Sequence, residues 1–210
     1  MTAAQQRAMK ELYPMYGIEP SKLPRIIEYS RNRARPIHCE IGIGNGENLI
    51  AMARAHPEAD FIGCEVHRPG VGYALQRIHA VGLENVRVYC GDVWTILHAL
   101  PAAAMDFCYV FFPDPWPKKR HHKRRLVSAD FFAAVSRVSR SHGRFYFASD
   151  SEDYADQVRE LLDTVPAWRN LAGGNQWSPR PQWRITTRFE KRAREAGRSV
   201  RELAAAKIAC

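Results

Sequence analysis

The alternation of short apolar segments with longer amphipathic ones limits the folds open to this chain more than any other feature. The apolar segments are rich in β-branched or aromatic residues and mostly bounded by turn formers, which is typical of buried strands. Five strands are expected, at 37–43, 60–66, 85–90, 106–112 and 143–148. Helices are expected between and after them, at 47–56, 69–81, 93–100, 129–139 and 152–165. This order predicts an α/β fold with a mostly parallel sheet and helices on both faces.

The two ends of the chain fall outside this alternation. Residues 1–35 are expected to form a helical segment of one or two helices packed on the core. Segment 172–182, rich in Gly, Pro and Asn, is expected as a surface loop. Segments 168–171 and 183–189 are expected to complete the sheet as a closing hairpin. Residues 191–210, rich in Ala, Arg and Glu, are expected as a C-terminal helix.

Length and composition suit one domain over residues 1–210, with 46% hydrophobic and 25% charged residues. No apolar run approaches the roughly 20 residues that span a bilayer. Residues 1–10 are polar and lack a signal-peptide core. We therefore expect no membrane partner and a cytoplasmic location. A homodimer and a monomer both stay open.

The cysteines and histidines do not suggest a metal site. The cysteines form no C-x-x-C pair, and His121 and His122 are adjacent rather than spaced as ligands on one helix face. We expect no metal, and free buried thiols, which suit a reducing compartment. The five cysteines are Cys39, Cys64, Cys90, Cys108 and Cys210.

The net charge is +9, from 31 Lys and Arg against 22 Asp and Glu. A basic protein attracts polyanions, although the same charge also serves solubility. The distribution is more informative than the total. Residues 118–125 read K-K-R-H-H-K-R-R, and a second basic region lies within 180–201.

A glycine-rich loop, E-I-G-I-G-N-G, runs from Glu40 to Gly46 at the end of the first expected strand. Gly42, Gly44 and Gly46 permit positive φ and close approach of the backbone to a ligand. Ligands of open α/β sheets lie outside the carboxyl ends of the strands. The loop is therefore the expected floor of a nucleotide-sized site, although a tight turn without a ligand also uses glycines.

Acidic residues end the next two strands. Glu65 follows the glycines by about 20 residues, where an acid accepts hydrogen bonds from ribose hydroxyls. Asp92 ends the third strand, where a carboxylate accepts from an adenine amino group or caps the helix that follows. The NAD fingerprint has its third glycine one residue later, and acids at Glu40 and Glu47 disfavour a diphosphate. The cation S-adenosyl-L-methionine is the cofactor that this loop favours.

The most specific segment is residues 111–125, F-F-P-D-P-W-P-K-K-R-H-H-K-R-R. Its prolines fix φ, so the turn that presents Asp114 and Trp116 is rigid before any substrate arrives. The basic run follows at once and is suited to phosphates. Trp116 suits either stacking on a base or packing within the turn. A basic solvated loop is the simpler alternative.

With this block the chain resembles the bacterial tRNA (guanine-N7-)-methyltransferases. The resemblance spans roughly residues 5–190. Its other motifs are E-I-G-I-G-N-G-E, F-I-G-C-E-V-H-R-P-G-V-G, A-S-D at 148–150 and T-R-F-E at 187–190. It implies a Rossmann-like S-adenosylmethionine-dependent methyltransferase fold with a seven-stranded sheet. It also implies tRNA as the partner and methylation of guanosine N7 in the tRNA variable loop.

The resemblance and the motifs together give the candidate site residues. The resemblance implies cofactor contacts at four acids, and the loop reading adds three glycines: Glu40, Glu65, Asp92, Asp114, Gly42, Gly44 and Gly46. It implies substrate contacts at Lys118, Asp150, Thr187, Arg188, Phe189 and Glu190. The basic run adds expected RNA contacts at Lys119, Arg120, His121, His122, Lys123, Arg124 and Arg125.

Guanine N7 has a free lone pair at neutral pH, so methyl transfer to it needs no prior proton removal. The enzyme then works by positioning and by stabilising the positive charge that develops on the base. Asp114 is the expected catalytic residue in that electrostatic role, rather than as a general base. A methyltransferase of the same fold acting on another RNA or a small molecule stays open, as does a non-catalytic RNA-binding protein.

Overall fold

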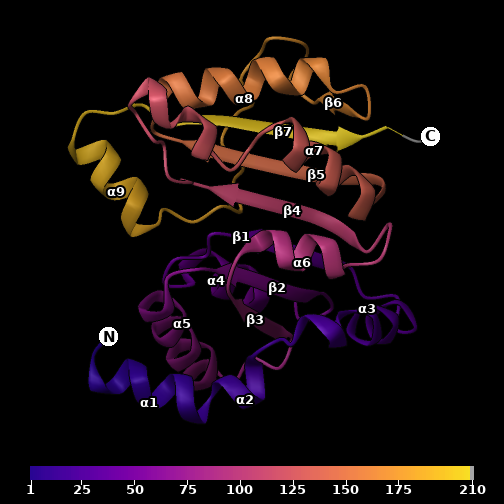
Figure 1. The fold of residues 1–210 in the computed structure, drawn as a ribbon, viewed down its shortest axis with the longest axis vertical. Coiled ribbons are helices and arrows are strands. Elements are labelled where there is room, and N and C mark those ends of the chain that lie inside the picture. The colour runs from indigo at the N-terminus through magenta and orange to yellow at the C-terminus, as the bar shows by residue number, and fades with distance from the viewer. Residues whose placement is uncertain (209–210) are drawn as a thin grey trace.

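The computed structural model describes residues 1–208 and contains one seven-stranded sheet in the order β3-β2-β1-β4-β5-β7-β6 (Figure 1). The first five strands in the chain pair in parallel, and β7 runs antiparallel to both of its neighbours. The strands are β1 (Ile37–Ile41), β2 (Asp60–Glu65), β3 (Val86–Cys90), β4 (Met105–Phe111), β5 (Ser139–Ser149), β6 (Trp168–Asn170) and β7 (Arg201–Lys207).

Helices precede, connect and follow these strands. The N-terminal segment holds α1 (Ala3–Glu11), α2 (Tyr13–Tyr16), the 3-10 helix η1 (Pro20–Lys22) and α3 (Leu23–Arg31). The crossovers hold α4 (Glu47–Ala55), α5 (Arg68–Val81), α6 (Val93–Ala99), η2 (Lys119–Arg124) and α7 (Ala129–Val138). The last third holds α8 (Glu152–Thr164) and α9 (Arg188–Glu195). None of these helices is both long and apolar enough to cross a membrane, within residues 1–208.

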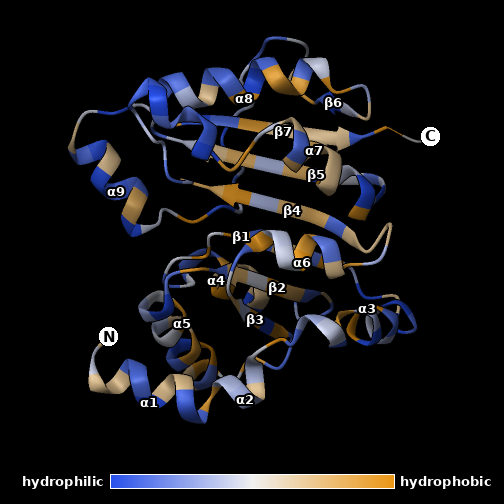
Figure 2. Cartoon of the chain, viewed as in Figure 1, coloured by the Kyte–Doolittle hydropathy of each residue, from blue (hydrophilic) through white to orange (hydrophobic). Residues whose placement is uncertain are grey.

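The core consists of two apolar clusters on opposite faces of the sheet, because successive side chains of a strand point to opposite faces. In β4, Cys108 and Val110 belong to one cluster, which α3, α6, α7 and α8 cover. Tyr109 and Phe111 belong to the other, which α1, α4 and α5 cover. Figure 2 shows the hydrophobic residues concentrated on the strands, whereas α9 is mostly hydrophilic.

The five expected parallel strands and the helices between and after them are confirmed, with ends that differ by a few residues. The largest difference is β5, which begins at Ser139 rather than at Gly143. The N-terminal segment is helical, as expected. Local capping explains where several helices start: Asp92 accepts from the backbone N–H of Trp94 at 3.0 Å at the start of α6.

The end of the chain differs from the prediction. Segment 183–189 is not a strand: it is irregular until α9 begins at Arg188. The seventh strand is β7, which lies in the segment expected to be a C-terminal helix. Its central run, Leu203 to Ala206, pairs with β5 on one side and lies next to β6 on the other. Pairing on two edges outweighs the helix propensity of alanine there. Cys210 lies outside the described residues.

The antiparallel direction of β7 has a consequence for the site. Arg201, at the start of β7, pairs with Ser149, at the end of β5. The chain must therefore return to the carboxyl edge of the parallel strands before β7 begins. That return places α9 beside the loops that follow β1 and β5.

Candidate active site

The glycine loop after β1 is fixed to the neighbouring strand. The backbone N–H of Gly42 donates to the carbonyl of Cys64 at 2.8 Å, at the end of β2. Gly42, Gly44 and Gly46 all have positive φ, at 77°, 56° and 76°. A Cβ at Gly46 would come within 2.9 Å of Ala74 Cβ, whereas one at Gly42 would meet nothing within 4 Å. Gly46 therefore permits close packing of α4 on α5, and Gly42 leaves open space for a ligand.

Glu65 is held in place from two sides. Its Oε2 accepts from the backbone N–H of Gly44 at 2.8 Å, and its Oε1 accepts from that of His67 at 2.8 Å. Its carboxylate therefore joins the end of β2 to the glycine loop. Asp92 lies exposed at the end of β3 and caps α6. Contacts of both acids with a cofactor stay predictions.

Glu40 lies at the carboxyl end of β1, beneath the glycine loop, with 4% of its surface exposed. Its Oε2 accepts from Asn48 Nδ2 at 3.1 Å. Burial raises the pKa of Glu40 to about 8, against a smaller opposing effect of the Asn48 hydrogen bond. The carboxyl is therefore largely protonated at neutral pH. The opening of the site beside the glycine loop, the mouth, therefore owes its acidity mainly to Glu47, Glu65, Asp92 and Asp114. The sequence alone predicted negative charge there from Glu40 as well as from Glu47.

The turn after β4 is rigid and pinned to β5. Phe112 and Trp116 both have positive φ, at 52° and 45°, which is rare for bulky residues. The backbone N–H of Phe112 donates to the carbonyl of Ala148 at 2.8 Å. Asp114 is exposed, and within residues 1–208 its carboxylate makes no ion pair or hydrogen bond. The turn therefore presents an unpaired carboxylate at the edge of the sheet.

Trp116 is engaged in packing. Its ring lies edge-on to His121, with centroids 5.9 Å apart, and the guanidinium of Arg124 lies 4.9 Å from its centroid. These contacts favour the packing role of Trp116 over free stacking on a base. They also tie η2 to the turn at 112–117 that follows β4, the acceptor turn.

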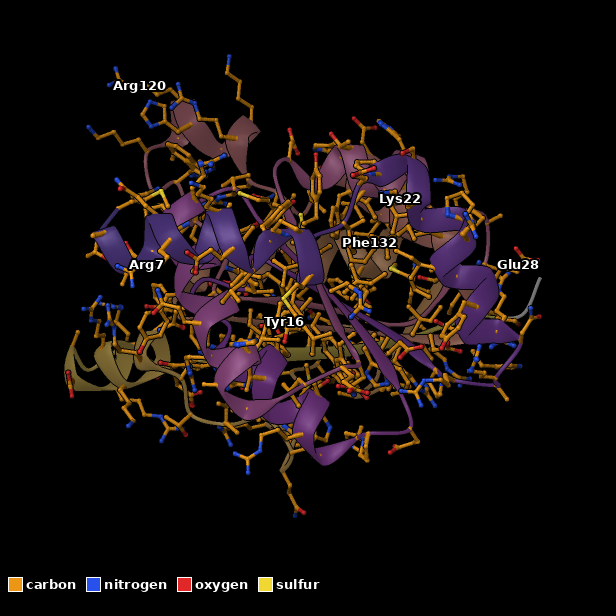
Figure 3. All side chains as sticks on the ribbon, turned by 90° about the horizontal axis from the view of Figure 1, so that it is seen from below. Arg7, Tyr16, Lys22, Glu28, Arg120 and Phe132 are labelled. Atoms are coloured by element: carbon orange, nitrogen blue, oxygen red, sulfur yellow. The ribbon has the colours of Figure 1, made fainter. Side chains whose placement is uncertain are left out.

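The basic run divides into exposed residues and one buried anchor. Five exposed cations lie in or next to η2: Lys118, Lys119, Arg120, Lys123 and Arg124. Figure 3 shows Arg120 on a projection from the body of the molecule. The side chain of Arg125 is only 1% exposed. It donates to the carbonyl of Pro115 at 2.9 Å and to Gln157 Oε1 at 2.6 Å, and it pairs with Asp153. Assigning Arg125 to RNA contact is therefore wrong: it attaches the turn to α8.

The T-R-F-E motif reaches the glycine loop from the far end of the chain. Thr187 caps α9, and the backbone N–H of Arg188 donates to Glu47 Oε2 at 2.8 Å. The ring of Phe189 would lie 3.3 Å from a Cβ at Gly44. Asp150, at the end of β5, pairs with Arg198 Nε at 2.8 Å. The motif and the glycine loop thus share one mouth.

Glu190 has a different place from its neighbours in the motif. Its side chain has no exposed surface and pairs with Arg184 Nη1 at 2.7 Å, Arg180 Nε at 3.2 Å and Arg194. Although burial alone would raise the pKa of Glu190, Arg184 and Arg180 hold it below its usual value. A buried, paired carboxylate is not available to a nucleotide. Glu190 acts on the site by holding α9.

Arg184 is the residue that sequence reasoning missed. Its side chain is fully buried and pairs with both Glu190 and Glu202 of β7. Its guanidinium lies 5.4 Å from the ring centroid of Phe111 and 5.6 Å from that of Phe112, at the start of the acceptor turn. In the sequence it appears only as one of several cations in a basic region. Its role depends on β7, which was expected to be helical.

Across the described part of the chain, no three His, Cys, Asp or Glu side chains are grouped closely enough to hold a metal ion. The described cysteines are free thiols, and three of them are buried: Cys39, Cys64 and Cys108.

Comparisons with known proteins identify the family. A family model described as "Putative methyltransferase" matches residues 34–203. The tRNA (guanine-N(7)-)-methyltransferase of Nitrosococcus oceani is 44% identical over 204 residues, covering 97% of this chain and 85% of the relative. That of Alcanivorax borkumensis is 42% identical, with the same coverage. The chain belongs to the tRNA (guanine-N7-)-methyltransferase family.

Solved structures agree on the fold of this family member. A SAM-dependent methyltransferase from Aquifex aeolicus has a TM-score of 0.55 at 15% identity, covering 91% of this chain and all of that one. A variant of the 16S rRNA (adenine(1408)-N(1))-methyltransferase from Catenulisporales acidiphilia has a TM-score of 0.59 at 16% identity, covering 91% and 92%. The methyltransferase fold predicted from the sequence is confirmed.

Arg184→Ala should lower the free energy of unfolding by about 3–5 kcal/mol, because it leaves two buried carboxylates without their shared partner. Arg194→Ala is the matched control. Arg194 pairs with the same Glu190, but its side chain is 55% exposed. Its loss should cost no more than about 1 kcal/mol. Urea unfolding measures both, and equal losses would contradict the burial argument.

Glu40→Gln should change how stability depends on pH. The folded pKa of Glu40, about 8, lies above its ordinary value of 4.5, so the folded state holds a proton that the unfolded state releases. The contribution of this proton to the free energy of unfolding is fully present below about pH 4.5. It is lost as the pH rises toward 8, by up to ~1.4 kcal/mol per pH unit. The amide that replaces the carboxyl in the variant cannot ionise. Urea unfolding of both cofactor-free proteins between pH 5 and 7.5 should show a steeper decline for the native chain, and parallel profiles would refute this.

Proposed function

We propose that this chain transfers the methyl group of S-adenosyl-L-methionine to N7 of a guanosine in tRNA, and that this guanosine lies in the variable loop. Family membership and the names of its relatives support the reaction and the RNA class. The resemblance of the P-D-P-W-P-K-K-R-H block supports the position in the loop. The observation that carries the proposal is the meeting of the glycine loop, the Asp114 turn and the T-R-F motif at one edge of the sheet.

The residues at this edge fit the cofactor. Gly42 leaves open space that would suit the methionine part of the cofactor. Glu65 would accept from its ribose hydroxyls, and Asp92 would accept from its adenine amino group. S-adenosyl-L-methionine supplies a methyl group made electrophilic by a positively charged sulfur. The acids of the mouth favour this cation and disfavour the diphosphate of NAD.

Asp114 would act on the acceptor base by charge rather than by proton removal. N7 of guanine attacks with its own lone pair, and the base becomes positively charged as the bond forms. A carboxylate held at a fixed position stabilises that charge in the transition state. The hydrogen bond between Phe112 and Ala148 and the packing of Trp116 fix the turn in advance. Asp114 can also accept from guanine N1–H, which would orient the base.

The remaining expected residues are proposed to contact either the substrate base or the RNA phosphates. Lys118, Asp150 and Thr187 lie around the mouth and are proposed to contact the substrate, with Arg188 and Phe189 beside them. Phe189 is 53% exposed over the glycine loop, which suits contact with a base. The exposed cations of η2 would bind phosphates. Free thiols in the described part of the chain support a cytoplasmic location.

Asp114→Ala should reduce methyl transfer about a hundredfold or more, because loss of one transition-state electrostatic contact costs ~3 kcal/mol. The assay is transfer of labelled methyl groups to total tRNA, followed by nucleoside analysis. The native chain should form 7-methylguanosine.

The matched control for this assay is Glu84→Ala, which removes an exposed acid just before β3, at the opposite edge of the sheet. It should leave the rate unchanged, and both variants should unfold like the native chain. Activity of Asp114→Ala within twofold of the native rate would remove Asp114 from the site. Methylation of another nucleoside, or only of ribosomal RNA, would contradict the proposed function.

The triple replacement of Lys119, Arg120 and Lys123 by Ala should weaken tRNA binding. The slope of the logarithm of the binding constant against the logarithm of the salt concentration should become shallower by up to about three, because each phosphate contact releases counterions. Cofactor affinity should not change. These three side chains are exposed, whereas Arg124 packs on Trp116 and Arg125 is buried.

Filter binding across a series of salt concentrations measures the slope, and Arg125→Ala provides the contrast. That variant should lose stability, because it leaves Asp153 and Gln157 without their partner. An unchanged slope in the triple variant would show that η2 is only a solvated surface.

A further inference from the structure

The outer face of α9 carries cations that the fold does not use. Glu190 and Ala193 face the body of the protein, and both are buried. The opposite side of the helix presents Arg188, Lys191 and Arg192, at the i, i+3 and i+4 spacing of one face. All three are exposed, and within residues 1–208 none forms an ion pair. By contrast, Arg194 pairs with Glu190, and Arg198, just beyond the helix, pairs with Asp150.

Three attachments hold α9 at a fixed place on the mouth. The backbone N–H of Arg188 bonds to Glu47 at its start, and Glu190 pairs with Arg184 in its middle. Arg198 pairs with Asp150 just after its end. The free cations on its outer face are therefore presented by a rigid support. A ligand that binds them does not have to order the helix, which lowers the cost of binding.

The position of α9 complements that of η2. Arg125 attaches the segment after η2 to α8, which belongs to one face of the sheet. The buried cluster of Arg184 with Glu190 and Glu202, together with Glu47, attaches α9 to the other face, where Phe111 and α4 lie. In Figure 3, Arg120 and the yellow helix α9 lie at the same end of the molecule, apart from each other. The acidic mouth lies between two basic surfaces.

We propose that the outer face of α9, through Lys191 and Arg192, is a second phosphate-binding surface, so that the RNA chain crosses the carboxyl edge of the sheet from η2 to α9. This rests on the proposed action on tRNA. The charge pattern favours such a path, because phosphates are attracted to both sides and repelled by the acids between them. The uncharged base and the cationic cofactor suit the acidic centre. Contacts on both sides would hold the acceptor nucleotide over Asp114.

The test is tRNA binding by the variant Lys191→Ala/Arg192→Ala, measured by filter binding at several salt concentrations. The salt slope should fall by up to about two units. Binding near physiological salt should weaken about tenfold, since each phosphate contact adds to the salt-dependent affinity. The KM for tRNA should rise, while kcat and cofactor affinity stay near their native values.

Two further variants separate a local contact from net charge and from misfolding. Arg25→Ala/Arg54→Ala removes the same charge from exposed positions in α3 and at the end of α4, toward the opposite edge of the sheet, and should leave the slope unchanged. Glu195→Gln removes the one acid of the outer face and should tighten binding, which damage to the fold would not do.

The outcomes distinguish this proposal from the function on which it rests. If the native chain methylates tRNA but has the same salt slope as Lys191→Ala/Arg192→Ala, the proposed phosphate-binding role of α9 is wrong, while the proposed function stands. Equal losses in the α9 variant and the Arg25→Ala/Arg54→Ala control would overturn it too, since net charge would then explain the effect. A native chain that neither binds nor methylates tRNA would refute both the proposed function and this surface.

Discussion

The buried cluster of Arg184 with Glu190 and Glu202 is the interaction on which the assembled site depends. Each residue comes from a different element: the loop before α9, α9 itself and β7. The cluster also lies against Phe111 and Phe112, from which the acceptor turn departs. A buried ion pair contributes little net stability when compared with apolar packing, but it is strict about geometry. Its function here is to set where α9 sits relative to the turn and the glycine loop.

The surface charge at the carboxyl edge of the sheet depends on which charged residues are buried and paired, as well as on their type. Arg184, Arg125 and Glu190 are buried and paired with opposite charges inside the fold, so their fields are largely offset at the surface. At the carboxyl edge of the sheet, exposed cations lie on η2 and α9, and the acids Glu47, Glu65, Asp92 and Asp114 lie at the mouth between them. A net charge of +9 is therefore compatible with a cation-binding centre. The total charge says little about the site until the internal pairs are removed from it.

Most of the fold was predictable from local signals. The parallel strands are short apolar runs, and Gly46 and Asp92 mark where helices begin. The seventh strand was not predictable in this way. The run Leu203–Ala206 has a composition that favours helix, and only pairing with β5 and β6 makes it a strand. The site shows the same division. The glycine loop and the Asp114 turn are continuous motifs, whereas the roles of Arg125 and Arg184 follow from partners 28 and 18 residues away.

Glu40 shows how such a site can discriminate by charge without a fixed charge of its own. In the cofactor-free chain its carboxyl is buried, and its pKa of about 8 keeps it mostly neutral. A cation brought to the glycine loop would favour the ionised form, since an opposite charge nearby lowers the pKa of an acid. A diphosphate would favour the protonated form and gain no attraction from it. Glu47 and Glu65 would give the first selection at the mouth, and Glu40 beneath them would add attraction only for a positively charged ligand. A preference of the loop for a cation over a dinucleotide would therefore have two layers, one half-buried and one fully buried.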